Sequence, residues 1–226
     1  MAYSFGALTN PLDLGEHFEQ IGASPAGGFT TENSIGKDRL GNYIAATNQQ
    51  RNKKSELLIS FRAINPDGGT VDIVLGGVGG AVEWVATKVT VRQVNNADAI
   101  VSVTLHQHDG NGNLHLAQKY TVSLPLSGYG VTANPITGLA GDDCADNCVS
   151  MEWSAEIMHK DKTNRLNDHL VGFSQGCRID CTQTYVDNAE TLTADPNWFI
   201  DSDVPSDDAE DTRSRVLRGH TFLAAD

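Results

Sequence analysis

The nine residues Val149–Ile157, which read VSMEWSAEI, decide the fold class of this chain. Alternate side chains of an extended backbone point to opposite faces. In this stretch one face is apolar and the other carries only Ser and Glu; the apolar positions are Val149, Met151, Trp153, Ala155 and Ile157. The alternation predicts a β-strand with one face in a hydrophobic core and the other in solvent.

The same two-residue period recurs along most of the chain. Val71, Ile73 and Leu75 fall at every second position, and a glycine-rich break follows over 76–80. From about Phe29 onward, such runs are separated by clusters of Gly, Asn and Asp, which favour turns between antiparallel strands. We predict a mainly β protein, an antiparallel β-sandwich or barrel that forms a single domain over 1–226.

The two ends of the chain have a different pattern. Leu14, Phe18 and Ile21 have helical spacing, so we expect a short helix over about 10–22 and at most one more helix elsewhere. The last residues, about 195–226, are expected to form an acidic C-terminal extension.

Composition excludes several classes of protein. The chain has 226 residues, with 16 Lys and Arg against 29 Asp and Glu, and a formal charge of −13. This acidity argues against sequence-specific nucleic-acid binding. The most apolar stretch, Ile73–Val82, is too short to span a membrane. Met1–Asp13 has no basic region followed by an apolar run, so we expect no signal peptide and synthesis in a cytoplasm.

The charges are unevenly distributed along the chain. Between Lys37 and Arg62 there are six basic and two acidic residues, whereas seven acidic and no basic residues lie between Asp195 and Asp211. A solvated acidic surface is one interpretation. The other is a contact between neighbouring subunits, with a basic segment on one and an acidic segment on the next. The residues expected in that contact are Arg51, Lys53, Lys54, Asp207, Asp208, Glu210 and Asp211.

A possible hairpin over Val101–Leu124 contains three histidines. A four-residue loop over Gly110–Asn113 would keep the apolar faces of its two strands together. This register would place His108 opposite His115, with His106 on the same face; three such imidazoles can bind zinc. A metal-dependent β-barrel enzyme is therefore one alternative. Because the same face carries Ser, Thr and Lys, we favour an ordinary solvated sheet face, with no metal and no cofactor.

The four cysteines form two pairs with three intervening residues. Cys177 and Cys181 lie in an alternating, strand-like segment, so their thiols would be about 13 Å apart, too far to share one ion. Cys144 and Cys148 lie in a loop rich in Gly and Asp. We expect buried or partly buried free thiols. Nucleophile elbows, phosphate loops and zinc-protease motifs are absent, so we do not expect an enzyme.

The segment Phe29–Ile64, FTTENSIGKDRLGNYIAATNQQRNKKSELLISFRAI, resembles structural proteins of tailed-bacteriophage particles, in particular tail-tube proteins. One strand leads into Lys-Asp-x-x-Gly-Asn, a second ends near Thr47, the polar Arg51–Lys54 follows, and a third strand covers Leu57–Ile64. The resemblance implies a β subunit of the virion that forms homo-oligomeric rings or stacked rings, contacts other virion proteins and has no catalytic residues. An acidic bore would let DNA pass without binding it.

A further alternative is a capsid-decoration or carbohydrate-binding β module. The aromatic residues Tyr129 and Trp198 would then be exposed for ligand stacking.

Overall fold

The computed structural model describes residues 12, 14–64, 69–78, 84–94, 97–108, 115–127, 130–131, 148–163, 169–187, 198–205 and 213–226. Within these residues the protein is mainly antiparallel β, as the sequence predicts, with two sheets packed face to face. The strands are β1 (Phe18–Lys37), β2 (Tyr43–Ala63), β3 (Gly69–Val78), β4 (Val85–Val94), β5 (Ile100–His108), β6 (His115–Ser127), β7 (Gly130–Val131), β8 (Cys148–Thr163), β9 (His169–Asp187), β10 (Trp198–Pro205) and β11 (Arg213–Leu223).

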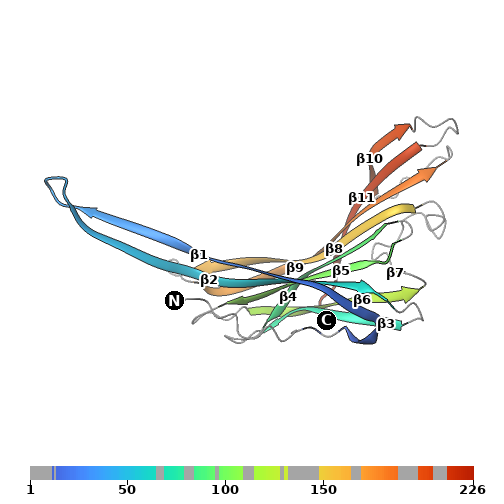
Figure 1. Cartoon of the computed structure of the whole chain (residues 1–226), viewed down its shortest axis with the longest axis horizontal. Coiled ribbons are helices and arrows are strands. Elements are labelled where there is room, and N and C mark those ends of the chain that lie inside the picture. Colours follow the sequence, from blue (N-terminus) through green and yellow to red (C-terminus); the bar gives the residue numbers. More distant parts are fainter. Residues whose placement is uncertain are drawn as a thin grey trace.

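The two sheets differ in size. Among the described strands the large sheet has the order β1-β2-β5-β4-β8-β9-β11-β10, and the small sheet has the order β3-β6-β7. In Figure 1 the small sheet lies below the centre of the large one, β1 and β2 extend far to the left, and β10 and β11 rise at the upper right. The first and last strand pairs therefore form opposite edges of the large sheet.

The core lies between the facing surfaces of the two sheets. Trp153, Ile157 and Ile179 of the large sheet are at most 1% exposed, as are Ile73 and Leu124 of the small sheet. The alternation predicted for VSMEWSAEI is confirmed at Trp153, Ala155 and Ile157, which are buried, and at the exposed Glu152 and Glu156. Period-two alternation therefore identifies the core-facing side chains correctly.

The helix expected over 10–22 is wrong for the residues that the structure describes there. A three-residue 3-10 turn, Gly15–His17, leads directly into β1, where Phe18 pairs with Ala63 of β2. Leu14 and Phe18 are buried, but Ile21 is 48% exposed. Pairing with β2 satisfies the backbone of this segment, so the helical spacing of its apolar residues does not decide its structure.

The C-terminal residues expected as an extension contribute β10 and β11 to the large sheet. After β11 the chain crosses to the small sheet. The Asp226 N–H donates to the carbonyl oxygen of Lys119 at 3.0 Å, and the Thr121 hydroxyl donates to the Asp226 carboxylate at 2.7 Å. The chain end therefore joins β11 of one sheet to β6 of the other.

Candidate assembly surface

The β1–β2 arm is the most extended feature of the molecule. The two strands pair along their length up to Lys37 and Tyr43, but β5 covers β2 only over Lys54–Arg62. Within the described residues, the arm beyond Lys54 is a two-stranded ribbon, and Figure 1 shows it projecting away from both sheets. A strand rises about 3.3 Å per residue, so the stretch from Lys54 to Tyr43 carries the tip roughly 35 Å from the body.

β2 is longer than expected. The sequence predicts that the second strand ends near Thr47 and that a separate strand begins at Leu57, but β2 runs without interruption through both. The polar segment Arg51–Lys54 therefore belongs to a strand. Lys54 pairs with Gly28 and Arg51 with Thr30 of β1, with a register shift between these two pairs, and this pairing does not require an apolar face.

The tip of the arm, Asp38–Asn42, is a tight loop organised by one carboxylate. The backbone N–H groups of Leu40 and Asn42 each donate to Asp38 Oδ1 at 2.8 Å, and the Asn42 amide donates to Oδ2 at 3.1 Å. Gly41 has a φ of +84°, a conformation that glycine adopts without strain. Hydrogen bonds from the Asn42 side chain, its N–H and the Leu40 N–H hold the Asp38 pKa below its ordinary value.

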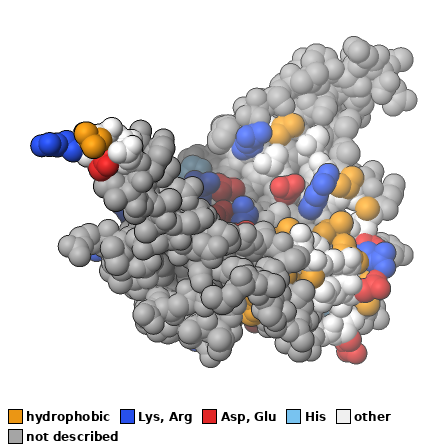
Figure 2. Space-filling view, turned by 60° about the vertical axis from the view of Figure 1, so that its left-hand side comes forward, with side chains coloured by type: hydrophobic (Ala, Val, Ile, Leu, Met, Phe, Trp, Pro, Cys, Tyr) orange, Lys and Arg blue, Asp and Glu red, His pale blue; other side chains and the backbone are white. Residues whose placement is uncertain are grey.

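Two side chains project from this loop. Leu40 is 83% exposed, the largest exposure among the large apolar side chains that the structure describes, and the neighbouring Arg39 is also exposed. Figure 2 shows basic and apolar side chains projecting together at the end of the arm. The sequence analysis did not identify Leu40, although the flanking Asp, Gly and Asn are strong turn signals.

The basic segment and the described residues that flank the acidic segment, Pro205 and Arg213, lie at opposite corners of the large sheet. Lys54 pairs with His108 at the base of the arm, and 206–212, which contain the acidic segment, lie outside the described residues between Pro205 and Arg213. A single cross-strand row connects the two regions: Arg62, Ile100, Arg92, Glu152, Thr182 and Arg218.

Along the strands, Lys54 lies on one side of this row and Arg213 on the other. From the rise per residue along a strand and the spacing between strands, Lys54 and Arg213 are on the order of 40 Å apart. Lys54 at the base of the arm and Arg213, where the described residues resume after 206–212, are therefore far apart within one subunit.

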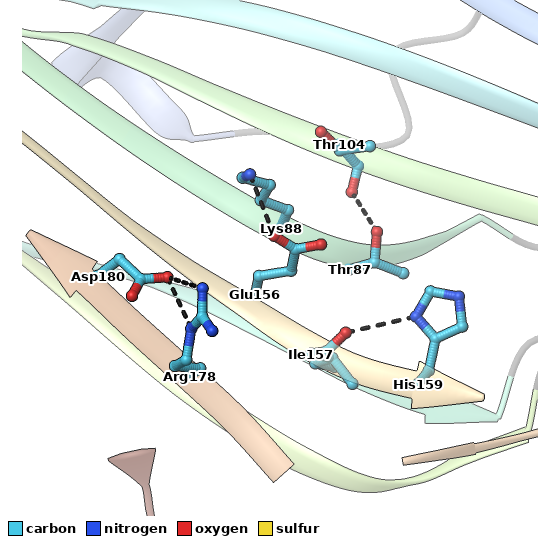
Figure 3. A network of polar contacts seen from close by, with 8 residues as sticks. All are labelled: Thr87, Lys88, Thr104, Glu156, Ile157, His159, Arg178 and Asp180. Atoms are coloured by element: carbon cyan, nitrogen blue, oxygen red, sulfur yellow. Dashed lines mark hydrogen bonds and ion pairs between the residues drawn. The ribbon is translucent and has the colours of Figure 1, made fainter. Parts of the chain in front are cut away.

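The outer face of the large sheet carries ion pairs, one between the neighbouring strands β4 and β8 and one within β9. Lys88 Nζ lies 3.1 Å from Glu156 Oε2, and the Arg178 guanidinium lies 2.7 Å from Asp180 Oδ2 (Figure 3). Figure 2 shows charged side chains of both signs in the hollow between the arm and the far end of the sheet. All four side chains are at least 39% exposed, so these pairs make only small contributions to stability.

The hairpin expected over Val101–Leu124 is wrong. β5 pairs with β2 and β4 of the large sheet, whereas β6 pairs with β3 and β7 of the small sheet. His108 is therefore opposite Lys54, and His115 is opposite Val78. The predicted cross-strand placement of His106, His108 and His115 does not exist, and with it the geometric argument for a three-histidine site is lost.

His106 instead contacts groups at the base of the arm. Its Nε2 lies 3.4 Å from Glu56 Oε2 on β2, and its ring meets His159 of β8 edge to face with centroids 5.9 Å apart. His159 Nδ1 lies 3.3 Å from the carbonyl oxygen of Ile157 (Figure 3). In the described part of the chain, no three His, Cys, Asp or Glu side chains have an arrangement suited to a metal ion.

The two cysteines of β9 face the core, as their spacing predicts. Cys177 and Cys181 are 0% and 2% exposed, and Cys177 is a free thiol. Burial, together with the charge of Glu156, raises the pKa of the Cys177 thiol to about 11. Cys144 lies outside the described residues, and Cys148 begins β8.

Comparison with known protein families and with curated protein sequences found no match. Among the described residues there is no helix with the length and apolar character that a membrane span requires.

Proposed function

We propose that this chain is a structural subunit that assembles with copies of itself, and that its setting is a tailed-phage particle, most specifically the tail tube. The observation that carries the proposal is the β1–β2 arm. A two-stranded ribbon is marginally stable in water unless further strands or packing support it. An arm roughly 35 Å long, held by only one strand pairing, is therefore best explained by a neighbouring subunit that covers it.

The charge distribution supports a head-to-tail contact. Arg51, Lys53 and Lys54 are at the base of the arm, and the acidic segment falls in the sequence between Pro205 of β10 and Arg213 of β11, which pair at the opposite corner of the large sheet. A contact between two different surfaces of identical subunits generates rings when its rotation closes, and filaments when it does not. Opposite charges at two separate places on the subunit are compatible with such a head-to-tail contact.

The phage setting is supported by the resemblance of Phe29–Ile64 to tail-tube proteins and by the net charge of −13. An acidic subunit around a bore would repel DNA phosphates, so the genome would pass without adhering. The alternative of a metal enzyme has lost the histidine pairing on which it depended.

The test is the mass of the purified chain by light scattering and sedimentation velocity, over a range of protein and salt concentrations, with negative-stain imaging of the largest species. We expect species above the monomer mass that increase with protein concentration and appear as rings or tubes. A chain that remains monomeric under every condition would contradict the proposal. Closed two-fold dimers alone would contradict the head-to-tail contact.

A further inference from the structure

We infer that the tip of the arm, Asp38–Asn42, is a preformed docking element that inserts Leu40 into a second copy of this chain. The inference rests on the proposed self-assembly and specifies the residues that make the contact. It uses a part of the molecule that the charge hypothesis does not involve.

The first argument is conformational. Docking by a flexible loop loses affinity because the loop must become ordered on binding. In the tip, three hydrogen bonds from Leu40 and Asn42 to the Asp38 carboxylate, and one from Gly41 N–H to the Asp38 carbonyl oxygen at 3.0 Å, fix the backbone in the single chain. The loop is therefore ordered before any partner binds.

The second argument concerns Leu40. At 83% exposure its side chain has almost its full apolar surface in water, at the end of a ribbon that extends away from the body. The paired strands β1 and β2 carry the tip away from the rest of the sheets (Figure 1). Another molecule must therefore cover Leu40 if it is to be buried.

The third argument identifies that molecule by charge. The tip and its flanking residue contain two basic side chains, Lys37 and Arg39, and one acidic side chain, Asp38, within a chain of net charge −13. A second copy is thus an acidic partner for a basic tip. Nucleic acid would also attract the tip, but the rest of the chain would repel it.

The experiment compares assembly of the parent with that of Leu40→Asp and Arg39→Glu, using sedimentation velocity over a concentration series. We expect each variant to raise the concentration at half-assembly at least tenfold. Leu40→Met keeps an apolar anchor and should stay within about threefold of the parent. Val74→Asp is the matched control, because Val74 is 47% exposed on the small sheet and should change assembly less than twofold.

The possible outcomes separate the two hypotheses. If the parent assembles and Leu40→Asp assembles equally well, the tip inference is wrong and self-assembly stands. If the parent never assembles, both are wrong. If the monomeric parent retards a DNA or RNA duplex on a gel and Arg39→Glu does not, the tip is a nucleic-acid contact and the inference is overturned. Circular-dichroism melting should give the same midpoint for the parent and the Leu40 and Arg39 variants, since the tip is remote from the core.

Discussion

Asp38 determines the shape of the arm tip through its carboxylate, which accepts from the N–H groups of both Leu40 and Asn42. These hydrogen bonds favour the ionised form and hold the Asp38 pKa below its ordinary value of 3.8. Their contribution to tip order is therefore complete above about pH 4 and is lost as the pH falls through the lowered pKa of the folded state.

Asp38→Ala should release the tip without unfolding the protein. The variant removes the acceptor for two backbone donors, so the amides of Leu40 and Asn42 should exchange with deuterium at least tenfold faster at pH 6. Asp38→Asn keeps one acceptor oxygen and should show a smaller increase. The parent should approach the exchange pattern of the Ala variant as the pH falls through the lowered pKa of Asp38, after correction for intrinsic rates. Unchanged exchange at Leu40 in the Ala variant would show that the loop does not depend on the carboxylate.

Cys177 should be chemically inert in the folded protein. The thiolate is the reactive form of cysteine, and a pKa of about 11 in a buried site leaves little thiolate at pH 8. Iodoacetamide at pH 8 should leave Cys177 unmodified for hours and label it within minutes in denaturant, as measured by peptide mass spectrometry. Rapid labelling of this cysteine in native buffer would mean that β9 is exposed to solvent.

At the scale of the elements, Gly76 controls how β3 fits between β6 and the large sheet. Its φ is +86°, and a Cβ atom there would lie 2.3 Å from the Gln118 carbonyl oxygen and 3.0 Å from Ile157 Cδ1. The β3–β6 pairing shifts its register at this point, between Gly76 and Gly77. The glycine therefore allows both the bulge and the close approach of the sheets.

Gly76→Ala should lower the free energy of unfolding by about 2 to 3 kcal/mol, because it combines an unfavourable φ with a backbone clash. Gly22→Ala is the control, since a Cβ at Gly22 meets nothing within 4 Å and should change stability by less than about 0.5 kcal/mol. The free energies of unfolding of both variants are measured by urea denaturation. Equal stability of the two variants would show that the sheets are not packed closely at Gly76.

The elements also show which features can be derived from sequence. Alternation at Val101, Val103 and Leu105 correctly predicts the buried face of β5, and the same holds for Tyr120 and Leu124 of β6. The predicted pairing of β5 with β6 is wrong because two strands with buried faces can lie side by side in one sheet or face each other from two sheets. The alternation of apolar residues is the same in both arrangements. They are distinguished only by the pairing of β5 with β2 and β4 and of β6 with β3.

The candidate site was only partly predictable. The basic segment Arg51–Lys54 was evident from its composition, but the polar character of this stretch was interpreted as a break between strands, whereas pairing with β1 keeps it extended. Leu40 could not be singled out, because a leucine beside a turn is usually buried by the chain that follows. Its exposure depends on the length of the arm, which is set by where the pairing of β2 with the distant strand β5 ends, at Lys54 and His108.

At the scale of the whole molecule, we propose a contact between the arm base of one subunit and the acidic segment of the next. Each exposed ion pair would contribute only about 0 to 1 kcal/mol, but in a ring the contribution would be repeated at every interface. Charges of this kind also accelerate encounter and fix orientation. Because the Debye length is about 8 Å at physiological ionic strength, added salt should weaken assembly.

The most direct test is a charge reversal with rescue, measured as assembled mass by light scattering at low salt. Lys53→Glu with Lys54→Glu should reduce assembly at least tenfold at an unchanged melting temperature, and adding Asp207→Lys with Asp208→Lys should restore it in part. Arg92→Glu with Lys119→Glu makes the same change in charge at exposed positions on the two sheets and should have a much smaller effect. If the Lys53/Lys54 variant assembles as well as the parent, or if the four-residue variant recovers none of the lost assembly, the basic and acidic segments do not meet between subunits.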